Sequence, residues 1–137
     1  MLVRTALLSL AVALAAPTGI SAFVPGATAQ TSEAKTFTPA AFEAAQKAGT
    51  PILVEVTAPW CSVCKAQKPI LSELTAKPKF AKLVTFRVDF DTQKDALKML
   101  GVQRQSTLIS YKGAKEVGRS TGVTDKSALE DQLSKSI

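Results

Sequence analysis

The chain has 137 residues, of which 46% are hydrophobic, and its formal net charge at pH 7 is +6. This length allows one domain and a targeting segment, but it is short for two domains. The basic residues are scattered and aromatic residues are few, so nucleic-acid binding has little support. The sequence contains no histidine, which removes the commonest metal ligand and the commonest general base.

The first residues have the order of a secretory signal. Residues 1–4 carry a positive charge, residues 5–16 are apolar, and Ala27-Thr28-Ala29 is a small-x-small site. We expect cleavage after Ala29, with Ala22 as an earlier option, and export, most simply to a periplasm. An uncleaved anchor is disfavoured because a bilayer span needs about 20 apolar residues. Residues 30–137 then form the mature domain, without a stable membrane anchor.

The mature chain begins with alternating strand and helix patterns. Residues 36–38 are expected to form a short edge strand. Thr38-Pro39 is typical of a helix start, and that helix is predicted to end at Gly49. Residues 51–57 are predicted to form a central strand with apolar residues on both faces, as in a sheet covered on both sides. Glu55 interrupts this apolar run.

The longest helix pattern covers residues 61–76 and begins at the two cysteines. Apolar residues at spacings of three and four predict its buried face. They are Val63, Ala66, Ile70, Leu71 and Leu74.

A second central strand is predicted at residues 83–89. After it, Thr92-x-x-Asp95 resembles a capping box and predicts a helix through Leu100. Residues 106–111 and 115–119 are predicted to form a hairpin.

A last helix is expected to be capped by Thr124. Its predicted buried face is made of Ala128, Leu129, Leu133 and Ile137. Strand–helix–strand units imply parallel pairing, and the hairpin adds antiparallel strands. The sequence therefore predicts an α/β, three-layer fold with a mixed central sheet and helices on both faces.

Both cysteines lie in Pro59-Trp60-Cys61-Ser62-Val63-Cys64-Lys65, where a strand meets a helix. A thiolate is the attacking species in disulfide exchange, and a helix N-terminus stabilises it through free N–H groups and the helix dipole. Cys61 is therefore the predicted nucleophile. Cys64, one turn deeper on the same helix face, is predicted to attack the mixed disulfide and release the substrate. This cycle needs no cofactor. A structural disulfide and a pair of inert buried thiols remain as alternatives.

Residues 54–65, with Pro69 five residues past the second cysteine, resemble the active-site strand and helix of the thioredoxin family. The resemblance covers about residues 36–137, and the Trp-Cys-x-x-Cys-Lys motif in this context is specific. It implies a thioredoxin-like fold, with Cys61 as the attacking cysteine and Cys64 as the resolving one.

Further site residues follow from the resemblance. Glu55 takes the place of a buried aspartate that manages protons for the resolving thiol, and Arg87 that of a neighbouring lysine. Glu55 could instead serve only as the ion-pair partner of Arg87. Gly122 matches a glycine beside the peptide-binding groove, and Trp60 offers flat apolar contact for a peptide.

Three departures from the family pattern stand out. Ser62-Val63 replaces Gly-Pro, and Thr57 replaces an aromatic residue. Ser106 stands where the family has a cis-proline, so it is a candidate substrate-binding residue. A cis bond before a non-proline residue costs about 2.5–4 kcal/mol. The sequence leaves open whether the bond before Ser106 is cis or trans.

These observations predict an exported thiol–disulfide oxidoreductase, most simply a protein-disulfide reductase acting as a monomer. Its expected partners are cysteine-containing exported proteins and an upstream thiol reductant or oxidant. One alternative is a binding or redox-sensing module with weak turnover, as the change at Ser106 suggests. Another is a dimer that shares four thiolates around a metal ion.

Overall fold

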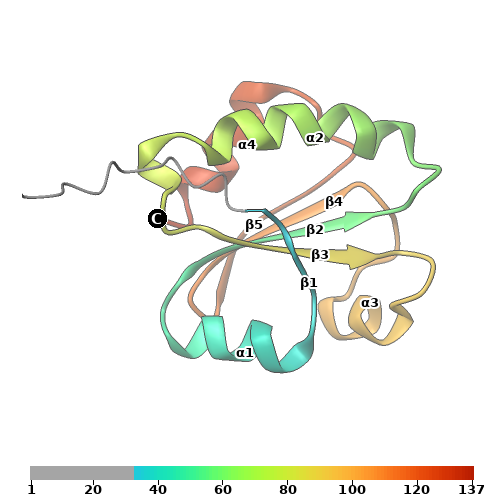
Figure 1. The fold of residues 1–137 in the computed structure, drawn as a ribbon, viewed down its shortest axis with the longest axis horizontal. Helices are drawn as coiled ribbons and strands as arrows, with labels where there is room; N and C mark the ends of the chain where they lie inside the picture. The colour runs from blue at the N-terminus through green and yellow to red at the C-terminus, as the bar shows by residue number, and fades with distance from the viewer. Residues whose placement is uncertain (1–32) are drawn as a thin grey trace, which may run out of the picture.

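The computed structural model describes residues 33–137, which form five strands and four α-helices (Figure 1). The predicted signal and its cleavage site lie outside the described residues. The strands are β1 (Lys35–Thr36), β2 (Pro51–Thr57), β3 (Val84–Asp89), β4 (Thr107–Lys112) and β5 (Lys115–Thr121). The helices are α1 (Pro39–Lys47), α2 (Ser62–Thr75), α3 (Lys94–Leu100) and α4 (Lys126–Ser134), with a 3-10 turn at Pro78–Phe80.

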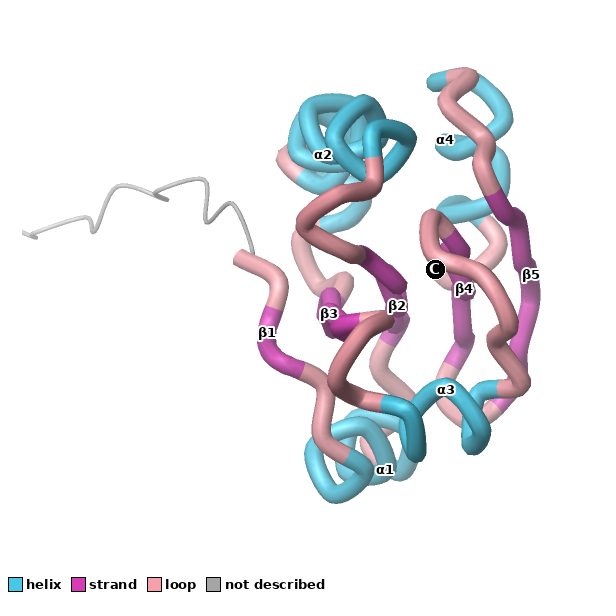
Figure 2. Tube along the Cα trace, turned by 90° about the vertical axis from the view of Figure 1, so that its right-hand side faces the viewer, coloured by secondary structure: helices cyan, strands magenta, loops and turns pink. Residues whose placement is uncertain are grey.

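The sheet has the order β1-β3-β2-β4-β5. Strands β1 and β2 both pair with β3 in parallel, whereas β4 is antiparallel to β2 and to β5. Helices α2 and α4 cover one face of the sheet, and α1 and α3 cover the other (Figures 1 and 2). The predicted three-layer fold with a mixed sheet is confirmed.

Strand β2 lies at the centre of the sheet and supplies both hydrophobic cores. Successive side chains of a strand point to opposite faces. Ile52, Val54 and Val56 belong to the core that includes residues of α1 and α3, whereas Leu53 belongs to the core that includes residues of α2 and α4. Glu55 follows Leu53 by two residues, and so its side chain points to the α2 face of the sheet.

The predicted buried face of α2 is confirmed at Leu71 and Leu74 but is wrong at Ala66. Its buried residues are Cys64, Gln67, Leu71 and Leu74. Ala66 is exposed, while Val63 and Ile70 are only partly buried. The prediction was wrong at Ala66 because hydrophobicity alone favours an alanine over the neighbouring Gln67, and the amide of Gln67 finds partners far away in the sequence.

Two predicted helix starts are also wrong in detail. Helix α3 begins at Lys94 without a side-chain cap. Thr92 does not cap it, because its N–H and its hydroxyl both donate to Asp89 Oδ1 at 2.9 Å. Helix α4 is capped by Asp125, whose carboxylate accepts from the N–H of Ala128 at 2.8 Å.

The predicted face of α4 is partly confirmed. Leu129 and Leu133 are buried, but Ala128 is exposed. Ile137 lies beyond the end of the helix and is 43% exposed. Among residues 33–137, no helix combines the length and the apolar character needed to span a bilayer.

Candidate active site

The two cysteines lie at the start of α2, just after the turn that follows β2. Cys61 is the N-cap residue of α2, and Cys64 lies in its first turn. Their sulfurs form a disulfide, with the Cα atoms 5.3 Å apart. The N–H of Cys64 points at Cys61 Sγ over 3.0 Å. A thiolate at Cys61 would therefore meet a free helix N–H and the positive end of the helix dipole.

Both cysteines are buried in this oxidised form. Cys61 is 3% exposed and Cys64 is 8% exposed. They pack with Ala58, and the partly buried Val63 and Phe90 lie against the group. We expected Cys61 to be reachable and Cys64 to lie beneath it. In this oxidised form that expectation is wrong: Cys61 is the less exposed of the two, and Val63 and Phe90 lie against the group.

The loop that carries Ser106 closes one side of the disulfide. The N–H of Ser106 donates to the carbonyl of Val56 at 2.8 Å, and Cys64 Sγ lies 3.9 Å from the same oxygen. No cis peptide occurs among residues 33–137, so the bond before Ser106 is trans. Ser106 instead has a positive φ of 58°. This left-handed conformation costs a non-glycine residue about 1–2 kcal/mol.

Gly122 lies beside Ser106 in a second loop. Its N–H donates to the Ser106 carbonyl at 3.0 Å, and its φ is 74°. A glycine suits this left-handed position because it has no Cβ. The two loop residues that the sequence predicted at the substrate groove are thus brought together by a backbone hydrogen bond.

Gln67 is a site residue that sequence reasoning missed. It is 3% exposed, and its Nε2 donates to the carbonyl of Ser106 at 3.2 Å and to that of Val123 at 2.9 Å. One amide thereby ties both loops to α2. The signal in the sequence is a polar residue three positions after Cys64 and four before Leu71, where helical spacing places it on their face.

Trp60 forms an exposed rim next to the disulfide. Its side chain is 58% exposed. The indole Nε1 donates to Asp91 Oδ2 at 2.9 Å, and the ring meets Phe90 edge to face at a centroid distance of 6.4 Å. The tryptophan is held in one orientation while most of its surface stays open to a polypeptide.

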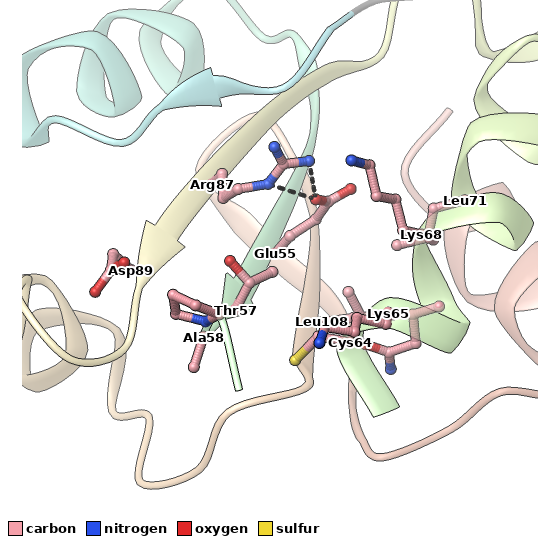
Figure 3. A pocket seen from close by; sticks show the side chains of 12 residues that line it. Glu55, Thr57, Ala58, Cys64, Lys65, Lys68, Leu71, Arg87, Asp89 and Leu108 are labelled. Carbon is pink, nitrogen blue, oxygen red and sulfur yellow. Dashed lines mark hydrogen bonds and ion pairs between the residues drawn. The ribbon is translucent and has the colours of Figure 1, made fainter. Parts of the chain in front are cut away.

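Glu55 is buried, with an exposed fraction of 8%, and its partner is Arg87. Arg87 donates to Glu55 Oε2 from Nη2 at 3.0 Å and from Nε at 3.3 Å. The two residues are cross-strand partners in β2 and β3. Both line a hollow of about 270 Å³ that also reaches Thr57 and Cys64 (Figure 3). The ion pair satisfies a buried carboxylate, which lines one cavity with Cys64.

Asp89 lies at the end of β3 and lines the same hollow. Its pKa is lowered, chiefly because the carboxylate accepts hydrogen bonds from the backbone and the hydroxyl of Thr92. The group is therefore ionised at neutral pH. Within residues 33–137, no cluster of three or more histidine, cysteine or acidic residues is arranged to hold a metal ion.

A family model described as Thioredoxin matches residues 33–135. The chain belongs to the thioredoxin family. A thioredoxin of Alicyclobacillus acidocaldarius is 32% identical over 98 residues, which cover 72% of this chain and 92% of that protein. A thioredoxin of Chlamydia muridarum is 36% identical over 84 residues, covering 61% and 80% of the two chains.

Solved structures agree with the family assignment. The crystal structure of Trxlp from Edwardsiella tarda is 48% identical and superposes with a TM-score of 0.71, covering 74% of this chain and 98% of that one. A thioredoxin with a Cys-x-x-Cys pair at the start of α2 is a thiol–disulfide oxidoreductase. The protein therefore exchanges disulfides through the Cys61–Cys64 pair.

Proposed function

We propose that this thioredoxin is an exported protein-disulfide reductase, in which Cys61 attacks and Cys64 resolves. The observation that carries the proposal is the N–H of Cys64, which lies 3.0 Å from Cys61 Sγ at the start of a 14-residue helix. This N–H and the helix dipole stabilise the thiolate of Cys61 in the reduced protein.

The catalytic cycle starts from the reduced enzyme, which acts as a monomer. The Cys61 thiolate attacks a disulfide of an exported protein, forms a mixed disulfide and expels one substrate thiolate. The Cys64 thiolate then attacks Cys61 Sγ, which releases the second substrate thiolate and forms the intramolecular disulfide. An upstream thiol reductant returns the pair to the dithiol. Trp60, Ser106 and Gly122 hold the polypeptide beside Cys61 in this proposal.

Glu55 takes the proton from the Cys64 thiol before the resolving step. Its carboxylate lies on the α2 face of the sheet and lines the hollow that Cys64 also lines. General bases of this kind are most useful where they are held within reach of the proton that they accept. The ion pair with Arg87 fixes the orientation of the carboxylate.

The catalytic roles are tested by reduction of insulin. We expect Cys61→Ser to lower the rate by more than about 100-fold, because the attacking thiol is lost. Cys64→Ser should instead accumulate a covalent adduct between Cys61 and the substrate, which mass spectrometry detects. Equal rates for wild type and Cys61→Ser would refute the proposal. A stable partner complex with slow exchange would favour a binding or sensing module.

Export follows from the order of charged, apolar and small residues at the start of the chain. The mature protein then begins at Gln30 and contains residues 30–137. N-terminal sequencing of the protein from a periplasmic fraction tests this cleavage. Full-length protein confined to the cytoplasm would contradict it.

A further inference from the structure

The hollow beside Cys64 borders one cysteine of the disulfide and not the other. Its lining includes Cys64, Thr57 and Ala58, but not Cys61. Figure 3 shows the Cys64 sulfur directed from α2 towards the end of β2. Thr57 stands where an aromatic residue is expected in the family, so a short side chain leaves this space open. Cys64 is also the more exposed cysteine, at 8% against 3% for Cys61.

The charges around the hollow favour an anion. Its lining contains the three cations Lys65, Lys68 and Arg87, against the carboxylates of Glu55 and Asp89. Arg87 and Glu55 satisfy each other. Asp89 accepts the hydrogen bonds of the turn that follows β3. Neither lysine has an ion-pair partner in the part of the chain that the structure describes. With three cations and two carboxylates, the lining carries a net charge of +1, and Cys64 belongs to the same lining.

We propose that this hollow admits small thiols and disulfides that carry an anionic group, and that inside it they exchange with Cys64. The oxidoreductase then has two access routes. Polypeptides reach Cys61 past Trp60, and small anionic thiols reach Cys64 from beneath α2. This inference requires the Cys61–Cys64 exchange chemistry, but neither export nor a protein substrate.

The exchange balances as two successive displacements. A small thiolate attacks Cys64 Sγ, the bond between the two cysteines breaks, and Cys61 leaves as a thiolate. The leaving sulfur already lies 3.0 Å from the N–H of Cys64, which stabilises the new charge. A second small thiolate attacks the ligand sulfur of the mixed disulfide, so that Cys64 leaves and takes up a proton. Two small thiols become one small disulfide, and the protein gains both electrons.

The proposal is tested on proteins that keep one cysteine each. Cys61→Ser, which retains Cys64, is mixed with the disulfide of 2-mercaptoethanesulfonate, and the adduct is followed by mass spectrometry. We expect an adduct on Cys64, and we expect Thr57→Trp to slow its formation at least tenfold by filling the hollow. In the matched control, Cys64→Ser with and without Thr57→Trp, the adduct on Cys61 should form at unchanged rate.

Two outcomes would overturn the proposal. One is that Cys61→Ser forms no adduct on Cys64, or forms it equally fast with and without Thr57→Trp. The other is an equal slowing at Cys61, which would mean that the tryptophan disturbs the whole site. Lys68→Glu, on the exposed surface of α2, provides a second test that does not depend on the folding of Thr57→Trp.

Lys68→Glu should lower the rate at which the anionic disulfide forms its adduct on Cys64 by about threefold or more. The rate with 2-hydroxyethyl disulfide, a neutral probe, should not change. If Lys68→Glu changes the adduct rates of the two probes by the same factor, or changes neither, the charge selection is refuted. None of these measurements uses insulin, so the reductase proposal and this one fail separately.

Discussion

The disulfide has a closed side, where the loops of Ser106 and Gly122 meet, and an open side, where a hollow is lined by Thr57, Glu55 and Arg87 and also by Gln67. On the closed side, a backbone hydrogen bond from Gly122 to Ser106 joins the two loops. The buried amide of Gln67 then ties both loops to α2. The open side keeps an ion pair and about 270 Å³ of space. The difference is that hydrogen bonds hold the backbone on one side of the pair, whereas the other side keeps unfilled space next to Cys64.

The largest effect is expected on the closed side. Gln67→Leu should lower the free energy of unfolding by about 2 kcal/mol, because the carbonyls of Ser106 and Val123 both lose a donor, the first in a buried place and the second in a partly buried one. Urea denaturation measures this change. Gln103→Leu is the matched control, because Gln103 is exposed and should shift stability by less than about 0.5 kcal/mol. A loss for Gln67→Leu no larger than that of the control would show that the two loops do not depend on the amide.

The open side is expected to affect rate more than stability. Glu55→Gln should slow release of substrate from the mixed disulfide about tenfold at pH 7, because the proton acceptor for Cys64 is lost. Stability should fall by less than about 1 kcal/mol, since Arg87 remains 41% exposed and solvated. Single-turnover kinetics of the mixed disulfide measures the release step.

Arg87→Gln is the matched control for that experiment, because it breaks the same ion pair while it keeps the carboxylate. If Glu55→Gln and Arg87→Gln slow release equally, Glu55 acts only as an ion-pair partner. A normal release rate in Glu55→Gln would lead to the same conclusion.

The smallest effect is a pH dependence at the rim of the hollow. The pKa of Asp89 is lower in the folded protein than its ordinary value of 3.8. A lowered folded-state pKa contributes stability that is present above 3.8 and is lost as the pH falls through the folded-state value. Asp89→Asn should therefore be slightly less stable than wild type at pH 7. Thermal unfolding from pH 7 to pH 2 should show this gap closing, and a gap that widens towards acid would contradict the assignment.

Some of the site was within reach of the sequence and some was not. The placement of Glu55 opposite Arg87 was anticipated through the family resemblance, and the two strands confirm it by their register. Whether the bond before Ser106 is cis or trans was left open. The backbone there depends on hydrogen bonds to Val56 and Gly122, which are distant in the sequence. The buried position of Gln67 was missed because its two partners are 39 and 56 residues away in the chain.

The sequence by itself determined the alternation of strands and helices and the delivery of a Cys-x-x-Cys pair to a helix start. These features depend on periodicity, turn residues and hydrogen bonds between near neighbours, all of which are written locally. Only the tertiary structure decided that Gln67 instead of Ala66 completes the buried face of α2, and which cysteine borders a cavity. Those outcomes depend on how side chains from distant strands and loops fill the space around the helix, and the space left by Thr57 exists only after they have packed.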